Sequence, residues 1–445
     1  MKTKPILSWG RAHRFAQSSI DVADMSAACQ GKDKLLPYGL GRSYGDSCLN
    51  KDGILLTTER LDHFIAFDRT HGIITCEAGV TLRDILLLCA TPNANGSYWF
   101  LPVTPGTKFV TLGGAIANDV HGKNHHRTGT FGRHVLSFTL RRSDGTVLTC
   151  SPIENVAFFR ATIGGLGLTG LIETVTLQLM SAPGLEMLTE DIAVHDLNDF
   201  YRFSSESENT WDYTVAWVDC QARGKALGRG IFSRGRHISG SGPVGNLLPT
   251  RSIPLAPPIS LINPLSVTTF NTLYRHKLCG AKTVRKIVPY DGFFYPLDGI
   301  GDWNKLYGTQ GFYQYQCVIP KAQAAEIIRT QLEEIAASGE GSFLIVLKTF
   351  GDLSSPGMLS FPMPGTTLAI DFPNRGASTL ALLDRLDTLT LSAGGRVYPA
   401  KDGRMSASAF QAYYPQYQEF ERYIDPHFSS SFWRRVTALS EGKNT

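Results

Sequence analysis

Hydrophobic and polar positions alternate in a way that predicts short strands and helices over the first 180 residues. Residues 171–180, LIETVTLQLM, alternate with a period of two and predict a strand, whereas residues 154–162, ENVAFFRAT, are typical of a helix. Residues 135–152, VLSFTLRRSDGTVLTCSP, predict a hairpin with Asp144-Gly145 at its turn. This part of the chain therefore mixes helices with antiparallel strands.

A strand, a turn and a capped helix are predicted within residues 72–92, GIITCEAGVTLRDILLLCATP. Gly79 marks the turn. Thr81 and Asp84 have the spacing of a capping box, in which each side chain accepts a hydrogen bond from the backbone of the other residue. The helix therefore begins directly after Thr81.

Three glycine-rich runs interrupt these elements: PYGLGRSYGD at residues 37–46, PGTKFVTLGGAIANDVHGKNHH at 105–126 and IGGLGLTG at 163–170. Such runs contain too little bulk to fill a core, and they allow the main chain to approach a ligand closely. The second run ends in three histidines and a lysine, which can bind an anionic or reacting group. Three runs spread over about 130 residues indicate one long ligand that is contacted at several points.

Two common nucleotide sites do not fit these runs. Gly165, Gly167 and Gly170 form a G-x-G-x-x-G pattern, but a nicotinamide site requires a strand before it and a helix after it. The predicted order here is the reverse. A Walker loop is excluded because no Gly-Lys-Ser/Thr follows any of the runs.

Length and composition indicate a protein of two domains. A chain of 445 residues with 42% hydrophobic and 18% charged residues can form two cores. Its eight cysteines include no C-x-x-C pair, which favours reduced thiols. Neither a signal peptide nor an apolar run of about 18 residues is recognisable, so the sequence predicts a cytoplasmic location.

The net charge of +4 is unevenly distributed. Between Gln221 and Tyr290 there are eleven Lys or Arg residues and no Asp or Glu, and residues 243–267 are rich in Pro and Leu. This composition suits peripheral contact with an anionic membrane, where a basic residue contributes about 1 kcal/mol. It equally suits capture of a lipid-linked phosphate, or an ordinary mobile surface loop. Nucleic acid is disfavoured, because stacking aromatics are not interleaved with the basic residues.

The chain resembles a known enzyme family over nearly its whole length, from about Trp9 to the C-terminus. PYGLGRSYGD, LDHFIAFD, ITCEAGVTLRDIL and TLGGAIA resemble the FAD-linked oxidases of the vanillyl-alcohol oxidase type. More specific segments resemble the decaprenylphosphoryl-β-D-ribose 2-oxidase subfamily: DVHGKNHHRTGTFG, IGGLGLTG, FYPLD, WNKLYG, YQCVIP, SFLIVLKTFG, LSFPMPG, DFP and YPAKDGR.

The resemblance implies a two-domain FAD-binding fold of the α+β class. Residues 1–181 and 396–445 are expected to bind FAD, and residues 182–395 to form an antiparallel-sheet cap over the substrate. The positions expected to contact FAD are Pro37, Tyr38, Gly39, Leu40, Gly41, Arg42, Ser43, Tyr44, Gly45, Asp46, Ser47, Gly106, Thr111, Leu112, Gly113, Gly114, Asn118, Asp119, Val120, His121, Ile172 and Tyr398. Backbone N–H groups in glycine-rich turns can hold phosphate oxygens without a lysine.

FAD is expected to bind without a covalent link. Many members of the wider group attach the flavin to a histidine in the first loop, but Arg42 and Ser43 stand at that place here. Cys48 is a much weaker candidate for attachment.

The resemblance assigns Lys401, in YPAKDGR, to the space between flavin and substrate, and His121 to a position beside the flavin ring. Either can transfer a proton or stabilise negative charge. The residues expected to contact the substrate are Tyr44, Lys123, Gln314, Gln316, Lys348 and Thr367. Gln314 and Gln316 would share one face of a strand and read sugar hydroxyls or phosphate, although structural amides fit equally well. Lys348 lies in an apolar strand and requires a partner.

Four positions depart from the mycobacterial members of the subfamily. Ala369 replaces a cysteine, Thr367 an asparagine, Phe294 a tyrosine and Tyr295 a histidine. These changes affect the pocket wall, so the resemblance defines the flavin chemistry better than the exact lipid-linked sugar.

The resulting hypothesis is FAD-dependent oxidation of a sugar hydroxyl to a ketone, at C2 of a polyprenyl-phospho-β-D-ribose. A short-chain dehydrogenase/reductase would complete epimerisation to the arabinose form. Alternatives are an aldonolactone or alditol oxidase acting on a soluble sugar, and a flavin-free binding protein with the same fold. A metal site at His121 and His125 is disfavoured, because Gly122 opposes the helix that their spacing requires.

Overall fold

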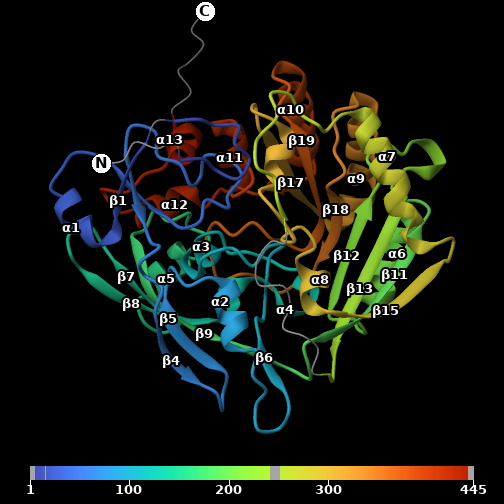
Figure 1. Ribbon diagram of the computed structural model, residues 1–445. Helices are drawn as coiled ribbons and strands as arrows, with labels where there is room; N and C mark the ends of the chain where they lie inside the picture. Colours follow the sequence, from blue (N-terminus) through green and yellow to red (C-terminus); the bar gives the residue numbers. More distant parts are fainter. Residues whose placement is uncertain (1–5, 16, 241–250, 439–445) are drawn as a thin grey trace, which may run out of the picture.

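The computed structural model describes residues 6–15, 17–240 and 251–438. Its strands form an eight-stranded and a five-stranded antiparallel sheet, together with smaller sheets (Figure 1). The ends of the chain and residues 243–250 of the Pro- and Leu-rich segment lie outside the described residues. Among the described residues, no helix is long and apolar enough to cross a membrane.

The part of the fold around the five-stranded sheet carries all three glycine-rich runs. In sheet order, its five-stranded sheet comprises β4 (Phe64–Asp68), β5 (Ile73–Glu77), β9 (Leu171–Gln178), β7 (Val135–Arg141) and β8 (Val147–Cys150). Beside it are the parallel strands β1 (Ser18–Asp21), β3 (Ile54–Thr57) and β2 (Leu35–Tyr38), and the pair β6 (Tyr98–Phe100) and β10 (Met180–Ala182). Its helices are α1 (Met25–Ala28), α2 (Leu82–Leu88), α3 (Leu112–Ala117), α4 (His125–Thr128) and α5 (Val156–Thr162).

The local elements predicted here are confirmed. Thr81 caps α2 by accepting a hydrogen bond from the Asp84 N–H, and the Asp84 side chain returns the bond, which completes the capping box. β7 pairs with β8 through the Asp144-Gly145 turn, where Gly145 has a φ of +87°. The helix α5 precedes the glycine run and β9 follows it, which is the order that excludes a nicotinamide site.

The eight-stranded sheet occupies the right of Figure 1, and all its paired strands are antiparallel. Its order is β15 (Thr283–Pro289), β11 (Glu186–Val194), β13 (Gly230–Ile238), β12 (Tyr213–Val218), β18 (Ile345–Phe350), β19 (Gly365–Pro373), β17 (Phe312–Pro320) and β20 (Arg396–Val397). The remaining elements are the strand pair β14 (Arg251–Ser252) and β16 (Ile300–Gly301), and the helices α6 (Leu197–Ser207), α7 (Pro264–Arg275), α8 (Tyr290–Phe294), α9 (Lys321–Ser338), α10 (Ala377–Ser392), α11 (Ala407–Tyr413), α12 (Tyr417–Glu421) and α13 (Ser431–Thr437).

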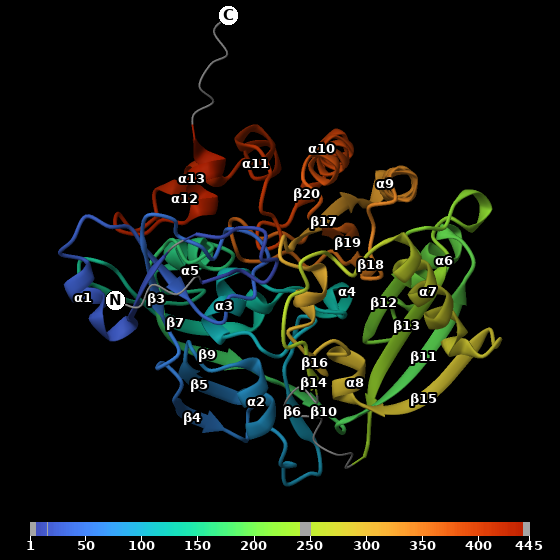
Figure 2. The ribbon, with the colours of Figure 1, turned by 45° about the horizontal axis from the view of Figure 1, so that its top comes forward.

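The two faces of this sheet have different roles. Successive side chains of a strand point to opposite faces, so Leu347 of β18 and Leu368 of β19 join the core formed with α6, α9 and α10 (Figure 2). Their neighbours Val346, Lys348 and Ala369 line a cavity on the other face. The α+β class is confirmed, whereas the division of the chain at residues 181 and 396 stays a prediction.

The C-terminal helices lie beside the N-terminal strands (Figures 1 and 2). Arg435 of α13 forms ion pairs with Asp46 at 2.7 Å and with Asp402 at 2.9 Å. The first of these carboxylates ends the first glycine-rich run and the second follows Lys401. One side chain thus joins two loops that lie more than 350 residues apart in the chain.

Candidate active site

A cavity of about 620 Å³ lies between the glycine-rich loops and the eight-stranded sheet. Its size falls in the range of cofactor and ligand sites. The positions expected to contact FAD that line it are Pro37, Gly39, Leu40, Gly41, Arg42, Ser43, Tyr44, Ser47, Gly106, Thr111, Gly113, Gly114, Asn118, Val120, His121, Ile172 and Tyr398. The expected catalytic and substrate residues that line it are Lys401, Gln314, Gln316 and Lys348.

The remaining expected positions lie behind this lining. Leu112 is a core residue of α3 and Tyr38 bonds to the Leu7 carbonyl. Asp119 accepts hydrogen bonds from the Gly132 N–H and from the hydroxyls of Ser355 and Ser360. Gly45 and Asp46 face Asp402 and Arg435. These residues shape the loops, and their contact with the cofactor stays a prediction.

The first glycine-rich loop has the properties of a phosphate cradle. Among the described residues, the N–H groups of residues 39–43 donate to no backbone carbonyl. Arg42 Nε and Ser47 Oγ are buried without a hydrogen-bond partner. Gly41 has a φ of +60°, and a Cβ there would lie 2.1 Å from the Tyr38 hydroxyl, so only glycine fits. Unpaired donors on a concave turn suit the pyrophosphate of FAD.

Lys401 lies with Nζ 3.7 Å from the centre of the Tyr44 ring, at the edge of the cavity. Burial lowers the pKa of Lys401 to about 7, with Asp371 opposing this shift and Lys348 adding to it. An amine with this pKa is partly neutral near pH 7 and can accept a proton.

His121 is held on the sheet side of the cavity. Its Nε2 lies 2.9 Å from Gln316 Nε2, and this Gln316 nitrogen also lies 3.2 Å from Thr367 Oγ1. Burial, with the nearby Lys348, His125 and Lys401, holds the pKa of His121 well below its usual range. The imidazole is therefore neutral, and Nε2 accepts the amide N–H. Its Nδ1 then carries a proton and is buried without a hydrogen-bond partner.

The other two lysines of the expected set differ in position. Lys348 lines the cavity, and burial lowers the pKa of Lys348 to about 8. Lys123 lies outside the lining: it donates to the Phe293 carbonyl, and its Nζ lies 4.4 Å from the centre of the Phe293 ring. Thr367 is likewise behind the lining, where it bonds to Gln316. Direct substrate contact by Lys123 and Thr367 stays a prediction.

Several lining residues were missed by the sequence analysis. Gly167 and Gly170 belong to the third glycine-rich run, and Asp298 to the FYPLD segment, so both signals were visible. Trp9, over which the Arg42 guanidinium lies at 4.2 Å, carries no such signal. Asp371, in the DFP segment, is fully buried and accepts a hydrogen bond from Gln314. Burial raises the pKa of Asp371 to about 7, against hydrogen bonds from Gln314 and Tyr307 and the charge of Lys401.

The positions that depart from mycobacterial members have clear environments. Ala369 lines the cavity and offers no thiol there. Tyr295 is buried and shares a 2.7 Å hydrogen bond with Thr104, and Phe294 packs edge-on against Tyr213. Cys48 also lines the cavity, and burial raises the pKa of Cys48 to about 12, which keeps its thiol protonated. Non-covalent flavin binding stays a prediction that release of free flavin on acid precipitation would confirm.

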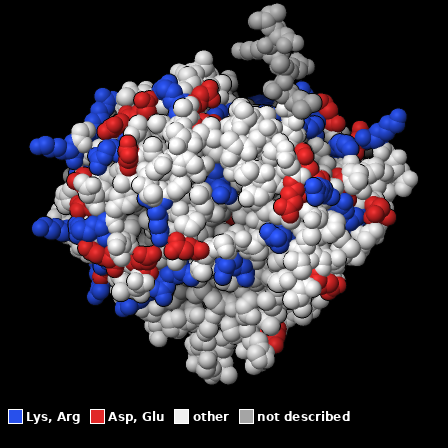
Figure 3. Space-filling view, turned by 180° about the vertical axis from the view of Figure 1, so that it is seen from behind, with Lys and Arg blue, Asp and Glu red and all other residues white. Residues whose placement is uncertain are grey.

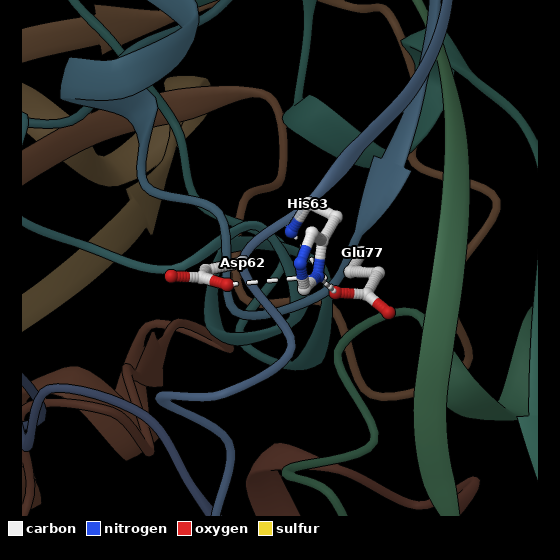
Figure 4. A group of neighbouring side chains, drawn as sticks. All are labelled: Asp62, His63 and Glu77. Atoms are coloured by element: carbon white, nitrogen blue, oxygen red, sulfur yellow. Dashed lines mark hydrogen bonds and ion pairs between the residues drawn. The ribbon is translucent and has the colours of Figure 1, made fainter.

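Asp62, His63 and Glu77 form a group with metal-ligand spacing away from the cavity (Figure 4). His63 Nδ1 lies 2.8 Å from Glu77 and 3.6 Å from Asp62. Asp62 and His63 are exposed, and such contacts are ordinary surface ion pairs. At the histidines considered from the sequence, α4 begins only at His125, so His121 lies outside the helix.

Comparison with known proteins agrees with the FAD site that the cavity indicates. Residues 12–151 match a family described as an FAD binding domain. The decaprenylphosphoryl-beta-D-ribose oxidase of Mycolicibacterium smegmatis is 34% identical, and the alignment covers 98% of each chain. The chain belongs to this oxidase family. It is an FAD-dependent oxidoreductase of the vanillyl-alcohol oxidase type, and the bound flavin supplies the hydride acceptor.

Other relatives cover less of the chain. A Streptomyces coelicolor protein of uncharacterised function is 34% identical, with 76% of this chain and 96% of the relative aligned. The L-gulonolactone oxidase of Mus musculus is 31% identical over only 35% of this chain and 33% of the relative. Similarity to the sugar-lactone oxidase is thus restricted to about a third of the length.

Replacing Lys401 tests its role in proton transfer. We expect Lys401→Ala to retain FAD but to slow flavin reduction by the alcohol substrate by roughly 10²–10⁴-fold, the usual contribution of a general base. In the wild type the rate should rise as pH increases through about 7, because the neutral amine accepts the proton. This rise should be absent from the variant.

Stopped-flow absorbance under anaerobic conditions measures both effects. Lys51→Ala, a change at an exposed lysine, is the matched control and should behave as the wild type. An unchanged rate and pH profile in Lys401→Ala would show that Lys401 is not the base.

Proposed function

We propose that this oxidoreductase converts the C2 hydroxyl of a polyprenyl-phospho-β-D-ribose to a ketone. The observation that carries the proposal is the convergence of Lys401, His121, Gln314 and Gln316 on one cavity that the glycine-rich loops also line. The name of the Mycolicibacterium smegmatis relative gives the substrate class, and alignment over 98% of both chains supports its transfer.

Different residues of the cavity have different roles in the alcohol oxidation. Lys401 accepts the hydroxyl proton, which leaves the carbon ready to deliver hydride to the flavin. The Nδ1–H of His121 is free to stabilise negative charge on a neighbouring group. Gln314 and Gln316 orient the sugar from the strand β17. Lys348, which forms no ion pair with the described residues, supports binding of an anionic group, such as the phosphate of the substrate.

A soluble lactone or alditol is the second candidate for the substrate. The partial match to L-gulonolactone oxidase supports it over about a third of the chain. The lipid-linked sugar is better supported because its relative matches the cap as well. Epimerisation to the arabinose form would require a second enzyme that reduces the ketone product by hydride transfer. A short-chain dehydrogenase/reductase is the proposed partner.

Substrate identity is tested by anaerobic bleaching of the flavin. A polyprenyl-phospho-β-D-ribose should remove the absorbance of the oxidised flavin in the wild type, because its C2 hydrogen is transferred as hydride. L-gulono-1,4-lactone at the same concentration should bleach it far more slowly. Bleaching by the lactone alone would replace the proposal with the soluble-sugar alternative.

Contact with an anionic membrane is proposed for the apolar segment of residues 255–300, which reaches the cavity at Ile300. Seven large hydrophobic side chains are exposed between residues 255 and 300: Leu255, Ile259, Leu261, Leu265, Leu273, Ile287 and Ile300. Ser252, Ile300 and Gly301 also line the cavity. An apolar surface next to the entrance would let a prenyl chain remain in lipid while its head group enters.

The positive charge of this region is partly neutralised. Lys277 pairs with Asp191, and Arg285 pairs with Glu190. Lys282 and Lys286 are exposed, and they form no ion pair with the described residues. On the face seen in Figure 3, Lys and Arg are interspersed with Asp and Glu around a broad uncharged area, so that face as a whole is not basic. Electrostatic attraction of residues 255–300 therefore depends on the cations left without an ion pair among the described residues, such as Lys282 and Lys286.

Sedimentation with vesicles tests this contact. The protein should sediment with vesicles of phosphatidylglycerol and phosphatidylcholine, and less with phosphatidylcholine alone. Lys282→Glu/Lys286→Glu should weaken binding to the anionic vesicles, because each basic residue contributes about 1 kcal/mol. Lys32→Glu/Lys51→Glu, at two exposed lysines near the N-terminus, is the matched control. Equal weakening in both double variants would refute a specific contact surface.

A further inference from the structure

Asp371 is a buried carboxylate that the proposed chemistry does not use directly. It is fully buried on β19, and in the antiparallel register it lies opposite Gln314 of β17. No Lys or Arg forms an ion pair with it among the described residues. Burial of a charge without an ion pair is costly unless hydrogen bonds compensate for it. Hydrogen bonds must therefore compensate for the burial of the Asp371 carboxylate.

Both oxygens of Asp371 are engaged by neutral donors. Oδ1 accepts a hydrogen bond from Gln314 Nε2 at 2.5 Å, and Oδ2 accepts one from the Tyr307 hydroxyl at 3.3 Å. Tyr307 is in turn 3.2 Å from Ser342 Oγ. Tyr307 and Ser342 are buried, whereas Gln314 lines the cavity. Gln314 is thus the only one of these three residues through which Asp371 reaches the cavity lining.

Above its pKa of about 7 the Asp371 carboxyl group is ionised, and an ionised carboxylate can only accept hydrogen bonds. The amide of Gln314 must therefore direct its NH₂ group to Asp371 and its carbonyl oxygen elsewhere. The Gln314 side chain also donates a hydrogen bond toward the Tyr44 oxygen, which opposes the rise that burial causes in the pKa of Tyr44, and Lys401 Nζ lies over the Tyr44 ring. The NH₂ group of Gln314 is thus directed to Asp371 and Tyr44, and its carbonyl oxygen accepts no hydrogen bond from the described residues.

The NH₂ group of Gln316 is also directed to protein atoms, but its partners are His121 and Thr367. Its NH₂ group donates to the neutral His121 Nε2 at 2.9 Å and lies 3.2 Å from Thr367 Oγ1. The two NH₂ groups are thus engaged with protein, and two carbonyl oxygens remain to accept hydrogen bonds. A pair of acceptors suits sugar hydroxyls, which donate, and does not suit a phosphate, whose oxygens only accept.

We infer that Asp371 is a positioning residue that fixes the Gln314 amide with its carbonyl oxygen available to a donor, so that this part of the cavity selects a sugar hydroxyl over a phosphate. This role rests on the proposed function for the identity of the sugar, and on the hydrogen-bond geometry for the selection. Asp371 acts through Gln314 and does not itself contact the substrate.

A double-mutant cycle tests the inference. Asparagine at position 371 can donate as well as accept, so Asp371→Asn removes the constraint on the Gln314 amide. We expect Asp371→Asn to retain FAD and to lower kcat/KM by about 10- to 100-fold, mainly through KM, the loss typical of a hydrogen bond to a charged group. In a Gln314→Leu background the same substitution should have little further effect. Rates are measured at pH 8.5, where the carboxyl group is ionised.

The competing explanation is a purely structural role. An equal loss from Asp371→Asn in both backgrounds, or an unchanged KM, would overturn the inference. If Asp371→Asn does not fold, Tyr307→Phe replaces it in the same cycle: it removes the other hydrogen bond to the carboxylate and should reduce kcat/KM less, again only when Gln314 is present. Additive losses would again contradict the inference.

Failure of the proposed function can be distinguished from failure of the inference about Asp371. If polyprenyl-phospho-ribose does not reduce the wild-type flavin but L-gulono-1,4-lactone does, the proposed substrate is wrong. The cycle is then performed with the lactone, which also carries hydroxyl donors. Non-additivity between positions 371 and 314 in that experiment would support the role of Asp371, and additivity would refute it.

Discussion

The active site depends on the close contact of two loops from opposite ends of the chain. The Tyr44 N–H donates to the Ala400 carbonyl at 2.9 Å, and a Cβ on Gly45 would lie only 1.6 Å from the Asp402 carbonyl oxygen. Glycine is therefore required where the loops meet. Arg435 holds both loops through Asp46 and Asp402. Breaking a buried ion pair typically costs about 3–5 kcal/mol. The two ion pairs of Arg435 therefore keep Lys401 in contact with the Tyr44 ring.

A second constraint is the sign of the charge around the cavity. Lys348 and Lys401 line it and Asp371 lies behind Gln314, while His121 is kept neutral by burial. Lys348 and Lys401 lie near each other and favour anions there, whereas Asp298 and Asp302 of the lining lie near a third cation, Arg42. FAD and a phosphate-linked sugar both bring negative charge, so the same residues that are costly to bury in the free protein stabilise the loaded one. Burial, with a smaller contribution from the charge of Lys348, lowers the pKa of Lys401 and makes it suited to accept a proton.

Much of this could be predicted from the sequence because the signals are local. The capping box of α2, the Asp144-Gly145 hairpin and the two-residue spacing of Gln314 and Gln316 each determine a short-range geometry. The family motifs further placed Lys401 and His121 in one site. That both line the cavity agrees with this placement, while their catalytic roles remain predictions.

The rest could not be predicted because it depends on partners distant in sequence. Nothing in the residues around Asp371 indicates that Tyr307 and Gln314 meet it, since these contacts arise only from the sheet register and from a turn more than 60 residues away. Lys123 was expected near the substrate from its motif, but its side chain is drawn to the Phe293 carbonyl and ring. The acid-free segment suggested a basic surface, yet Glu190 and Asp191 of the neighbouring strand β11 neutralise part of it.

The central claim is that the cavity aligns the C2 hydrogen of a lipid-linked ribose for transfer as hydride. Single-turnover reduction of the flavin by polyprenyl-phospho-ribose carrying deuterium at C2 tests it most directly. We expect a markedly slower reduction than with the unlabelled substrate, and no slowing when deuterium is placed at C3. Equal rates for the C2-labelled and unlabelled substrates, or slowing with the C3 label instead, would contradict the account.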